Sequence, residues 1–508
     1  MRYRFICIAT IVVMILGGIC VQNVDEGKNR YHQHMEAYEK EICTEHGEEE
    51  FCTHLPLINI TTEEEIPAAY IFEENVSRQA IGLGEPAFIR HRNYEVVAAN
   101  VQYFDNQTEN NHLGDTAAFE NKAWIRVRGA SSREFDKKNY LLKFTNDDMT
   151  VNQDVSFSGM TADNEWVLHG PFLDKTLIRN YLCYNLAGEI MDYAPNVRFC
   201  EAFINGEYMG VYLIQEKIGY NKKGRITLEK TDPDIASTSY ILEMDRGTDD
   251  ELRKITSFGN YSYITAAEGA ELGQLEVVYP GKTLTEAQRD FIQRDFSRFE
   301  KALFSFDYNS PQKGYERYID ENSFIDYFLI NEFTLNYDAM GYSTFLYKDL
   351  GDRLKLCVWD FNSAFDYYEY SVASPETFIL QNSMWYSALF QDEDFVKKVE
   401  KRYHELRESY FDEEYLNNYI DETVAYLGDA IDRNYEKWGY SFESEYNGVI
   451  YDYLKPRHRN VRTYEEAIEQ MKECIGERIE HMDNNIGRLY ILCHESLNKK
   501  ENNNGEVE

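Results

Sequence analysis

The chain has 508 residues, and its 89 Asp and Glu against 52 Lys and Arg give a formal net charge of −37. A hydrophobic share of 43% indicates a folded protein, and at about 100–200 residues per domain the length allows several domains. A negative field of this size repels nucleic-acid backbones and anionic lipid surfaces, so no nucleic acid is expected as a partner.

The N-terminus has the pattern of an export signal. Arg2 and Arg4 precede an uncharged apolar run over residues 5–21, which is typical of a secretory signal. The run is also at the lower limit of what spans a bilayer, so residues 1–22 are either a signal peptide or a retained N-terminal membrane anchor. Cys20 leaves lipidation open as a third alternative. In each case the body is expected to be exported, extracellular or on the cell surface.

The cysteines do not form a metal-binding pattern. The chain has nine of them, with no CxxC pair and no His/Cys spacing of a zinc site. Cys43 and Cys52 bracket an acidic loop and are the candidates for a local disulfide. Five others stand singly in apolar patterns and are predicted to be buried thiols: Cys183, Cys200, Cys357, Cys474 and Cys493.

The first half of the chain is predicted to be rich in strands. A helix over residues 176–190, with Asp174 as a possible cap, interrupts them. Asn205-Gly206 separates two apolar runs and predicts a hairpin, because these two residues adopt the positive φ angles of a two-residue turn. The expected strands before this hairpin cover residues 55–61, 68–72, 94–104, 123–128 and 139–144.

The second half is predicted to be helical. Thr285 and Gln288 form a capping box ahead of one amphipathic helix, and Asn322 or Ser323 is expected to cap the next. Residues 392–489 are almost wholly of amphipathic helical pattern.

One strand pair within the helical half brings two carboxylates together. Residues 344–348 and 354–359 predict an antiparallel hairpin, in which the start of the first strand lies beside the end of the second. Asp338 precedes the first strand and Asp360 ends the second, so both are expected at one mouth. Such a pair either binds a metal ion or shares a proton, while a single Asp more often caps a turn.

A turn in the first half has the residues of a phosphate site. Arg128 and Gly129 begin a turn of small residues that leads into Lys137 and Lys138 and then a strand. A turn able to approach phosphates, followed by a strand bearing lysine, is the order of a kinase small lobe. The alternative is that these lysines lie on a solvated strand edge.

These segments together resemble the CotH kinases, the spore-coat-protein-H family, which are atypical members of the protein-kinase-like superfamily. The resemblance covers about residues 120–370 and rests on several motifs in order. They are Arg128–Tyr140, Trp166–Leu168 with Asp174 and Arg179–Asn180, Asn205–Glu216, Tyr240–Asp245, Asn336–Asp338 and Trp359–Phe361.

The resemblance implies an α+β, two-lobed atypical protein-kinase-like fold, with a β-rich N-terminal lobe and a largely helical C-terminal lobe. The expected organisation is an acidic stalk over residues 23–54 after the signal or anchor, an N-terminal lobe with nucleotide-binding elements over 55–250, a C-terminal lobe with catalytic and metal-binding elements over 251–490, and a polar tail over 491–508.

The resemblance also implies ATP and Mg²⁺ or Mn²⁺ as cofactors and assigns roles to residues. Lys138, or Lys137 as second choice, would bind the nucleotide phosphates together with Arg128. Asp338 matches the catalytic aspartate that accepts the proton of the acceptor hydroxyl, and Asp360 matches the metal-binding aspartate of a DFG-like element.

Four further positions match the family pattern less closely or leave a choice open. Glu216 or Glu243 would orient the lysine, and the family pattern leaves the choice open. Ser343 and Asn362 stand at metal-ligand positions where the family has Asn and often Asp, respectively. Both replacements are expected to weaken metal binding, which puts activity in doubt.

Three functions fit this sequence. The first is an exported, ATP-dependent protein kinase that phosphorylates a Ser/Thr-rich surface or coat protein, although ATP is scarce outside the cytoplasm. The second is a pseudokinase that serves as a binding, adhesin-like or assembly module. The third is a carbohydrate-active enzyme that uses Asp338 and Asp360 as acid and base.

Overall fold

The computed structural model describes residues 30–36, 40, 51–74, 88–221, 224–247, 250–257, 273–366, 374–443 and 461–494. The expected signal or anchor, Cys43 and the chain after residue 494 lie outside these ranges. Residues from Gln33 onward form one unit, which is described below. Among the described residues, no helix is both long enough and apolar enough to cross a membrane.

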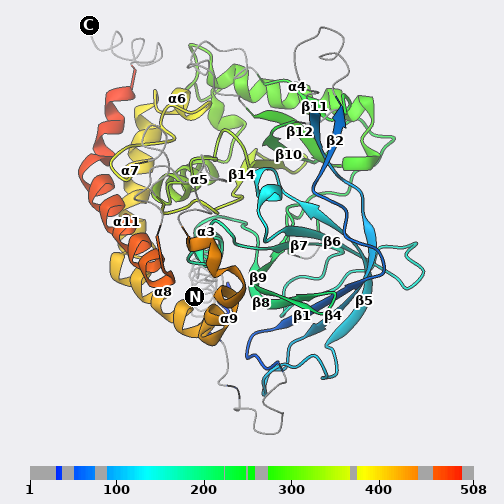
Figure 1. Ribbon diagram of the computed structural model, residues 1–508. Helices are drawn as coiled ribbons and strands as arrows, with labels where there is room; N and C mark the ends of the chain where they lie inside the picture. Colours follow the sequence, from blue (N-terminus) through cyan, green and yellow to red (C-terminus); the bar gives the residue numbers. More distant parts are fainter. Residues whose placement is uncertain are drawn as a thin grey trace, which may run out of the picture. The chain divides into compact units, whose positions relative to one another are not determined.

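Seven strands of the first half close into a barrel in the order β1-β4-β5-β6-β7-β9-β8 (Figure 1). In β5, Ala123, Ile125 and Val127 point into the apolar interior, so Arg126 and Arg128 point outward. A hairpin of β2 (Tyr70–Glu74) and β3 (Phe88–Arg92) pairs apart from the barrel. The barrel strands are β1 (Leu57–Thr62), β4 (Val97–Phe104), β5 (Phe119–Arg128), β6 (Asn139–Thr145), β7 (Glu165–His169), β8 (Val197–Ile204) and β9 (Glu207–Glu216).

The strands predicted in the first half are confirmed, with ends that shift by a few residues. The β8–β9 turn is the predicted one, because Asn205 and Gly206 have φ angles of 52° and 79°. The expected β-rich lobe is thus a closed barrel, in which all strands are paired on both sides.

A second sheet has the strand order β11-β12-β10-β13-β14. One of its faces packs on helices through Tyr240, Leu242 and Leu346, and the other face bears Glu243 and Asp245. Strands from both sides of residue 250 enter this sheet. Its strands are β10 (Tyr240–Asp245), β11 (Lys254–Ile255), β12 (Gln274–Tyr279), β13 (Thr344–Lys348) and β14 (Lys355–Cys357).

The helices follow the predicted patterns. Thr285 and Gln288 make the capping box of α4, but α5 is capped by Asp320 rather than Asn322 or Ser323, because the Asp320 carboxylate accepts the Ser323 amide. The helices are α3 (Arg179–Ile190), α4 (Glu286–Leu303), α5 (Glu321–Phe333), α6 (Tyr386–Leu389), α7 (Glu393–Arg407), α8 (Glu413–Leu427), α9 (Asp429–Trp438) and α11 (Tyr464–Asn485).

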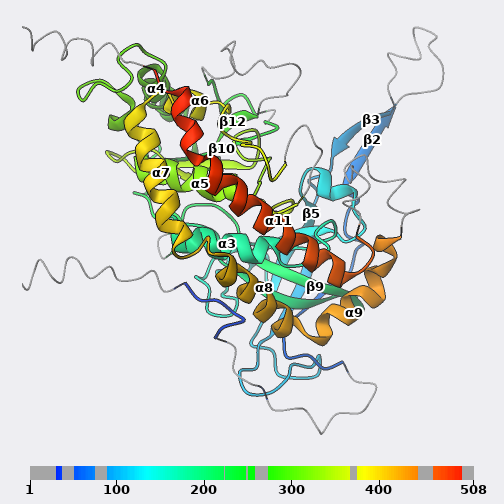
Figure 2. The ribbon, with the colours of Figure 1, turned by 90° about the vertical axis from the view of Figure 1, so that its left-hand side faces the viewer.

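One continuous apolar core joins the helices to the outer wall of the barrel. Helices α3 and α5 are almost wholly buried in it, while α7, α8 and α11 cover them on one side (Figure 2). The barrel interior is a separate core. The protein is therefore a mixed α+β fold with a sheet-rich region and a helical C-terminal part, as predicted.

The expected stalk over residues 23–54 lies partly within the described residues. Gln33, within the expected stalk, exchanges two hydrogen bonds with the Phe199 main chain of β8, at 3.2 and 2.6 Å, so this part of the stalk packs on the fold. Cys43, one half of the expected Cys43–Cys52 disulfide, lies outside the described ranges. The buried thiols predicted at Cys183, Cys200, Cys357 and Cys474 are confirmed, while Cys493 is only partly buried.

Candidate active site

Asp338 and Asp360 lie at the same end of the β13–β14 hairpin. Asp338 is in the turn between α5 and β13, and Asp360 follows β14, whose Cys357 pairs with Phe345 of β13. Burial and the nearby charge of Asp360 raise the pKa of Asp338 to about 7, against the opposing effect of Arg246. The structure thus brings together the two carboxylates that the hairpin predicted.

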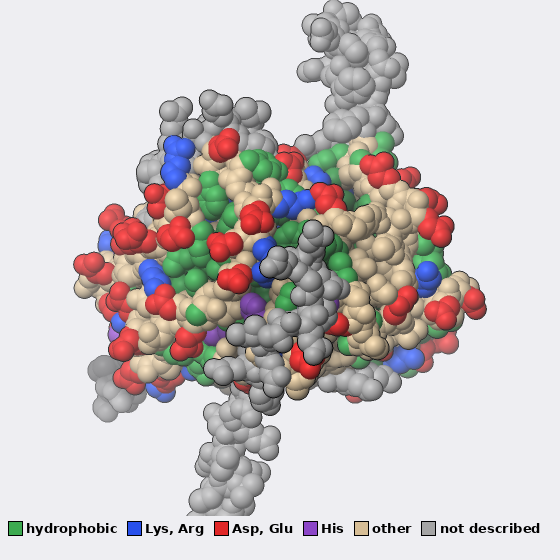
Figure 3. Space-filling model, turned by 60° about the horizontal axis from the view of Figure 1, so that its bottom comes forward, with side chains coloured by type: hydrophobic (Ala, Val, Ile, Leu, Met, Phe, Trp, Pro, Cys, Tyr) green, Lys and Arg blue, Asp and Glu red, His purple; other side chains and the backbone are tan. Residues whose placement is uncertain are grey.

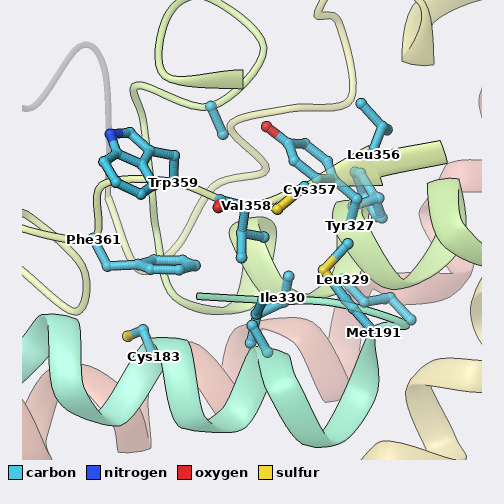
Figure 4. Packing of buried hydrophobic residues seen from close by; sticks show 14 of the residues in the cluster. Cys183, Met191, Tyr327, Leu329, Ile330, Leu356, Cys357, Val358, Trp359 and Phe361 are labelled. Carbon is cyan, nitrogen blue, oxygen red and sulfur yellow. Dashed lines mark hydrogen bonds between the residues drawn. The ribbon is translucent and has the colours of Figure 1, made fainter. Parts of the chain in front are cut away.

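The turn at Asp360 is tightly held. Asp360 has a positive φ of 60°, and its amide donates to the Tyr184 hydroxyl at 2.9 Å. Trp359 and Phe361 flank it and pack into the core above α3 (Figure 4). Burial raises the pKa of Asp360, while the charge of Arg128 opposes this. The main chain at Asp360 is therefore held in place, and burial disfavours the charged form of its carboxylate.

The outer wall of the barrel opposite these carboxylates is basic. Arg128 lies over the Trp359 ring at 5.5 Å, and Arg126 lies over the Tyr94 ring at 5.3 Å. Burial and the neighbouring charges of Arg133 and Arg128 lower the pKa of Arg126 to about 10. These arginines therefore concentrate positive charge on one part of the barrel wall. On the face of the protein shown in Figure 3, by contrast, carboxylates and basic groups are intermixed.

A lysine–glutamate–lysine cluster extends this wall across β6, β7 and the end of β9. The Glu165 carboxylate accepts hydrogen bonds from Lys143 at 3.1 Å and Lys217 at 2.6 Å. Although burial opposes ionisation, the two lysines lower the pKa of Glu165 to about 2. Lys143 points outward because it alternates with the inward-facing Leu142 and Phe144. The sequence interpretation did not single out this cluster.

The facing wall is acidic and comes from the second sheet. Burial, together with Asp245 and Glu276, raises the pKa of Glu243 to about 7. The charges of Lys217 and Arg128 act on Glu243 in the opposite direction, which places the barrel wall and this sheet face within electrostatic reach of each other. A basic and an acidic wall thus face one another beside Asp338 and Asp360.

The structure places Lys137 away from these carboxylates. Its buried amine donates to the Val211 carbonyl at 2.6 Å and to the Asn434 side chain of α9 at 2.7 Å. Burial lowers the pKa of Lys137 well below its usual range. These contacts attach α9 to β9, which is a structural role.

Lys138 and Glu216 are also occupied elsewhere. The Lys138 amine donates to the Arg133 carbonyl at 2.9 Å, within its own turn. The buried Glu216 carboxylate, at the C-terminal end of β9, accepts a hydrogen bond from the Asn196 amide at 3.0 Å. Neither is brought to the carboxylate pair, whereas Arg128 and Glu243 are.

The two departures from the family pattern have different surroundings. Ser343 is partly buried, with a φ of 50°, just before β13. The Asn362 side chain donates to the Asp360 carboxylate and accepts a hydrogen bond from Asn180 at 2.7 Å. Asn362 therefore donates a hydrogen bond to the Asp360 carboxylate, whereas an aspartate at this position would add a second negative charge.

The donor chemistry of the site fits a hard divalent cation. Asp338 and Asp360 offer carboxylate oxygens, which Mg²⁺ and Mn²⁺ prefer, and burial raises the pKa of both, so a bound cation would favour their charged forms. The described ranges contain no cluster of three or more His, Cys, Asp or Glu in a metal-binding arrangement. The pair suits an ion that takes its other ligands from phosphate and water.

A family model described as CotH kinase protein matches residues 125–482, more than half of the chain, so the chain belongs to this family. Among curated proteins, it is similar to the inner spore coat protein H of Bacillus subtilis (strain 168), with 25% identity over 244 residues. That match covers 47% of this chain and 58% of the relative, so the chain spans little more than half of the relative's length.

Proposed function

We propose that this chain is an exported CotH-type kinase that transfers the γ-phosphate of ATP, with Mg²⁺ or Mn²⁺, to Ser or Thr hydroxyls of a surface or coat protein. The observation that carries the proposal is the Asp338–Asp360 pair facing a basic barrel wall. The family supports kinase chemistry, and the coat protein among its relatives supports the location. In this proposal the barrel and the helical half correspond to the two lobes of a kinase.

Each residue has a definite task in this proposal. Asp338 accepts the proton of the acceptor hydroxyl, and a pKa of about 7 suits a base that works near neutral pH. Asp360 holds the divalent ion, which when bound neutralises phosphate charge. Arg128 and Lys143 bind phosphate oxygens from the barrel side, so that they overcome the repulsion of an acidic protein locally.

The direct test is transfer of labelled phosphate from ATP to a Ser-rich acceptor protein with Mg²⁺ or Mn²⁺. Asp360→Ala is expected to lower the rate by at least about 100-fold, because it removes the carboxylate assigned to the metal. Asp352→Ala, at the exposed turn of the same hairpin, is the matched control and should retain the wild-type rate. Equal rates in the wild type and Asp360→Ala would contradict the mechanism.

A second assignment tests the barrel wall. Lys143→Met is expected to weaken ATP binding about tenfold, because it removes a cation that binds Glu165 on the outer barrel wall and that is assigned to phosphate in the proposed function. Lys138→Met should change affinity less than about twofold, since the Lys138 amine bonds within its own turn. Isothermal calorimetry with ATP and Mn²⁺ measures both constants. A larger loss in Lys138→Met than in Lys143→Met would restore the sequence-based choice of lysine.

The second candidate function is a pseudokinase that binds a partner without transferring phosphate. Ser343 and the Asn362–Asp360 hydrogen bond favour it, because both reduce the ligands left for metal. It predicts no stabilisation by ATP and metal. A ligand that binds only the folded state at 100 times its Kd adds about 2.7 kcal/mol, so thermal unfolding at millimolar ATP and Mn²⁺ separates the two functions.

A further inference from the structure

Helix α3 directs two buried side chains at the turn that contains Asp360. Asn180 and Tyr184 are four residues apart and so lie on the same face of the helix. Tyr184 accepts the amide of Asp360 at 2.9 Å and receives a second hydrogen bond from Gln215 of β9, also at 2.9 Å. The helix thus connects the barrel wall to the turn.

Asn180 uses both ends of its amide on this turn and its surroundings. Its oxygen accepts the Phe361 amide at 2.9 Å. Its nitrogen donates to the Asn362 oxygen at 2.7 Å and to Nε2 of His169 at 3.0 Å. Because the Asn180 nitrogen donates, Nε2 of His169 accepts this hydrogen bond and carries no proton. This agrees with the pKa of His169, which burial and the charges of Arg128 and Lys137 lower to about 3.

These bonds fix the orientation of the next amide. Because the Asn362 oxygen accepts a hydrogen bond from the Asn180 side chain, the Asn362 nitrogen faces Asp360, to which it donates. An ionised Asp at position 362 has no proton to donate and would place a second negative charge beside Asp360. The chain of hydrogen bonds accounts for the amide that this sequence has at position 362.

We propose that Asn180 is a positioning residue that, through Asn362 and the Phe361 main chain, fixes the Asp360 carboxylate in the orientation that binds the divalent cation. We call the hydrogen-bonded series Asn180–Asn362–Asp360 the relay. It rests on the proposed function in one respect, namely that Asp360 binds the divalent cation. Side chains that orient a metal ligand typically change metal affinity by about 10–100-fold when they are removed.

The test measures Mn²⁺ affinity by electron paramagnetic resonance in Asn180→Ala, Asn362→Ala and the double variant of the full chain, with ATP present. Each single variant is expected to bind Mn²⁺ about tenfold more weakly than the wild type. The double variant should bind Mn²⁺ no more weakly than the single variant of lower affinity, because both substitutions break the same relay. Asn185→Ala is the matched control, since Asn185 is a buried amide of the same helix that bonds Tyr419 instead.

A second variant and a second measurement distinguish failure of the relay from misfolding of a variant and from failure of the proposed function. Asn362 is only partly buried, so Asn362→Ala tests the relay even if Asn180→Ala fails to fold. Hydrogen exchange without metal should be about tenfold faster at the Phe361 amide in Asn180→Ala than in Asn185→Ala. Wild-type affinity in both single variants, or fully additive losses, would overturn the relay while leaving the proposed function intact. If the wild type binds no Mn²⁺, the proposed function fails and hydrogen exchange alone tests whether Asn180 holds the Asp360 turn. Equal exchange rates at the Phe361 amide in Asn180→Ala and Asn185→Ala would overturn the relay, and faster exchange in Asn180→Ala would support it.

Discussion

Asp338→Asn is expected to lower the rate of phosphate transfer by about 10²–10⁴-fold, because the amide cannot take the proton of the acceptor hydroxyl. ATP and Mn²⁺ binding should change far less, since Asp360 and the basic wall remain. Labelled-phosphate transfer and calorimetry, measured on the same preparation, separate the two effects. A variant that keeps wild-type transfer would show that Asp338 is not the base.

The same substitution should stabilise the fold at high pH. The pKa of Asp338 is about 7 in the folded protein. An ordinary aspartate has a pKa of about 3.9, so the folded state binds the extra proton. That stabilisation is present at low pH and is lost as the pH rises towards 7. The stability of Asp338→Asn relative to the wild type should therefore increase by about 1–3 kcal/mol between pH 4 and pH 8. Urea unfolding at both values checks this, with the exposed Asp352→Asn as control; a constant difference would contradict it.

The carboxylate pair could be predicted because it depends on local information. One antiparallel hairpin brings Asp338 and Asp360 together, and the hairpin follows from two short apolar runs with a Gly-containing turn between them. The Asn205-Gly206 turn was predictable for the same reason. Neither prediction needs to know what packs against the strands.

The basic wall could not be predicted in the same way. Alternation in β6 shows that Lys143 points away from the barrel interior, but it does not show that Glu243 of a different sheet lies within electrostatic reach of Lys217 and Arg128 on the same wall. That sheet is assembled from residues 240–279 and the distant β13–β14 hairpin. Similarly, Lys137 is compatible with a solvated strand edge in the sequence, and its burial follows from contacts with β9 and with α9, about 300 residues later. The Asn180 relay needs the same tertiary information, because α3 contacts a turn far along the chain.

Arg478→Met is expected to destabilise the protein by about 3–5 kcal/mol, because it breaks a fully buried ion pair and leaves the other charge uncompensated. Arg478 of α11 and Glu332 of α5 are both 0% exposed and form an ion pair. The guanidinium also donates to the carbonyls of Pro375 and Thr377, at 3.0 and 2.6 Å. Its removal takes the guanidinium hydrogen bonds away from the buried main-chain carbonyls of Glu332 and Pro375.

The effect should reach the site, because α5 ends at Phe333, a few residues before Asp338, and the Thr334 carbonyl accepts the Phe365 amide just beyond the Asp360 turn at 2.7 Å. Lys472→Met is the matched control on α11, since its 2.6 Å pair with Asp421 is solvent-exposed and such pairs contribute about 0–1 kcal/mol. Urea unfolding of both variants at pH 7 measures the difference. Equal losses would mean that α11 stabilises the protein through its apolar face alone, and that the Glu332–Arg478 pair does not hold the helix that leads into the Asp338 turn.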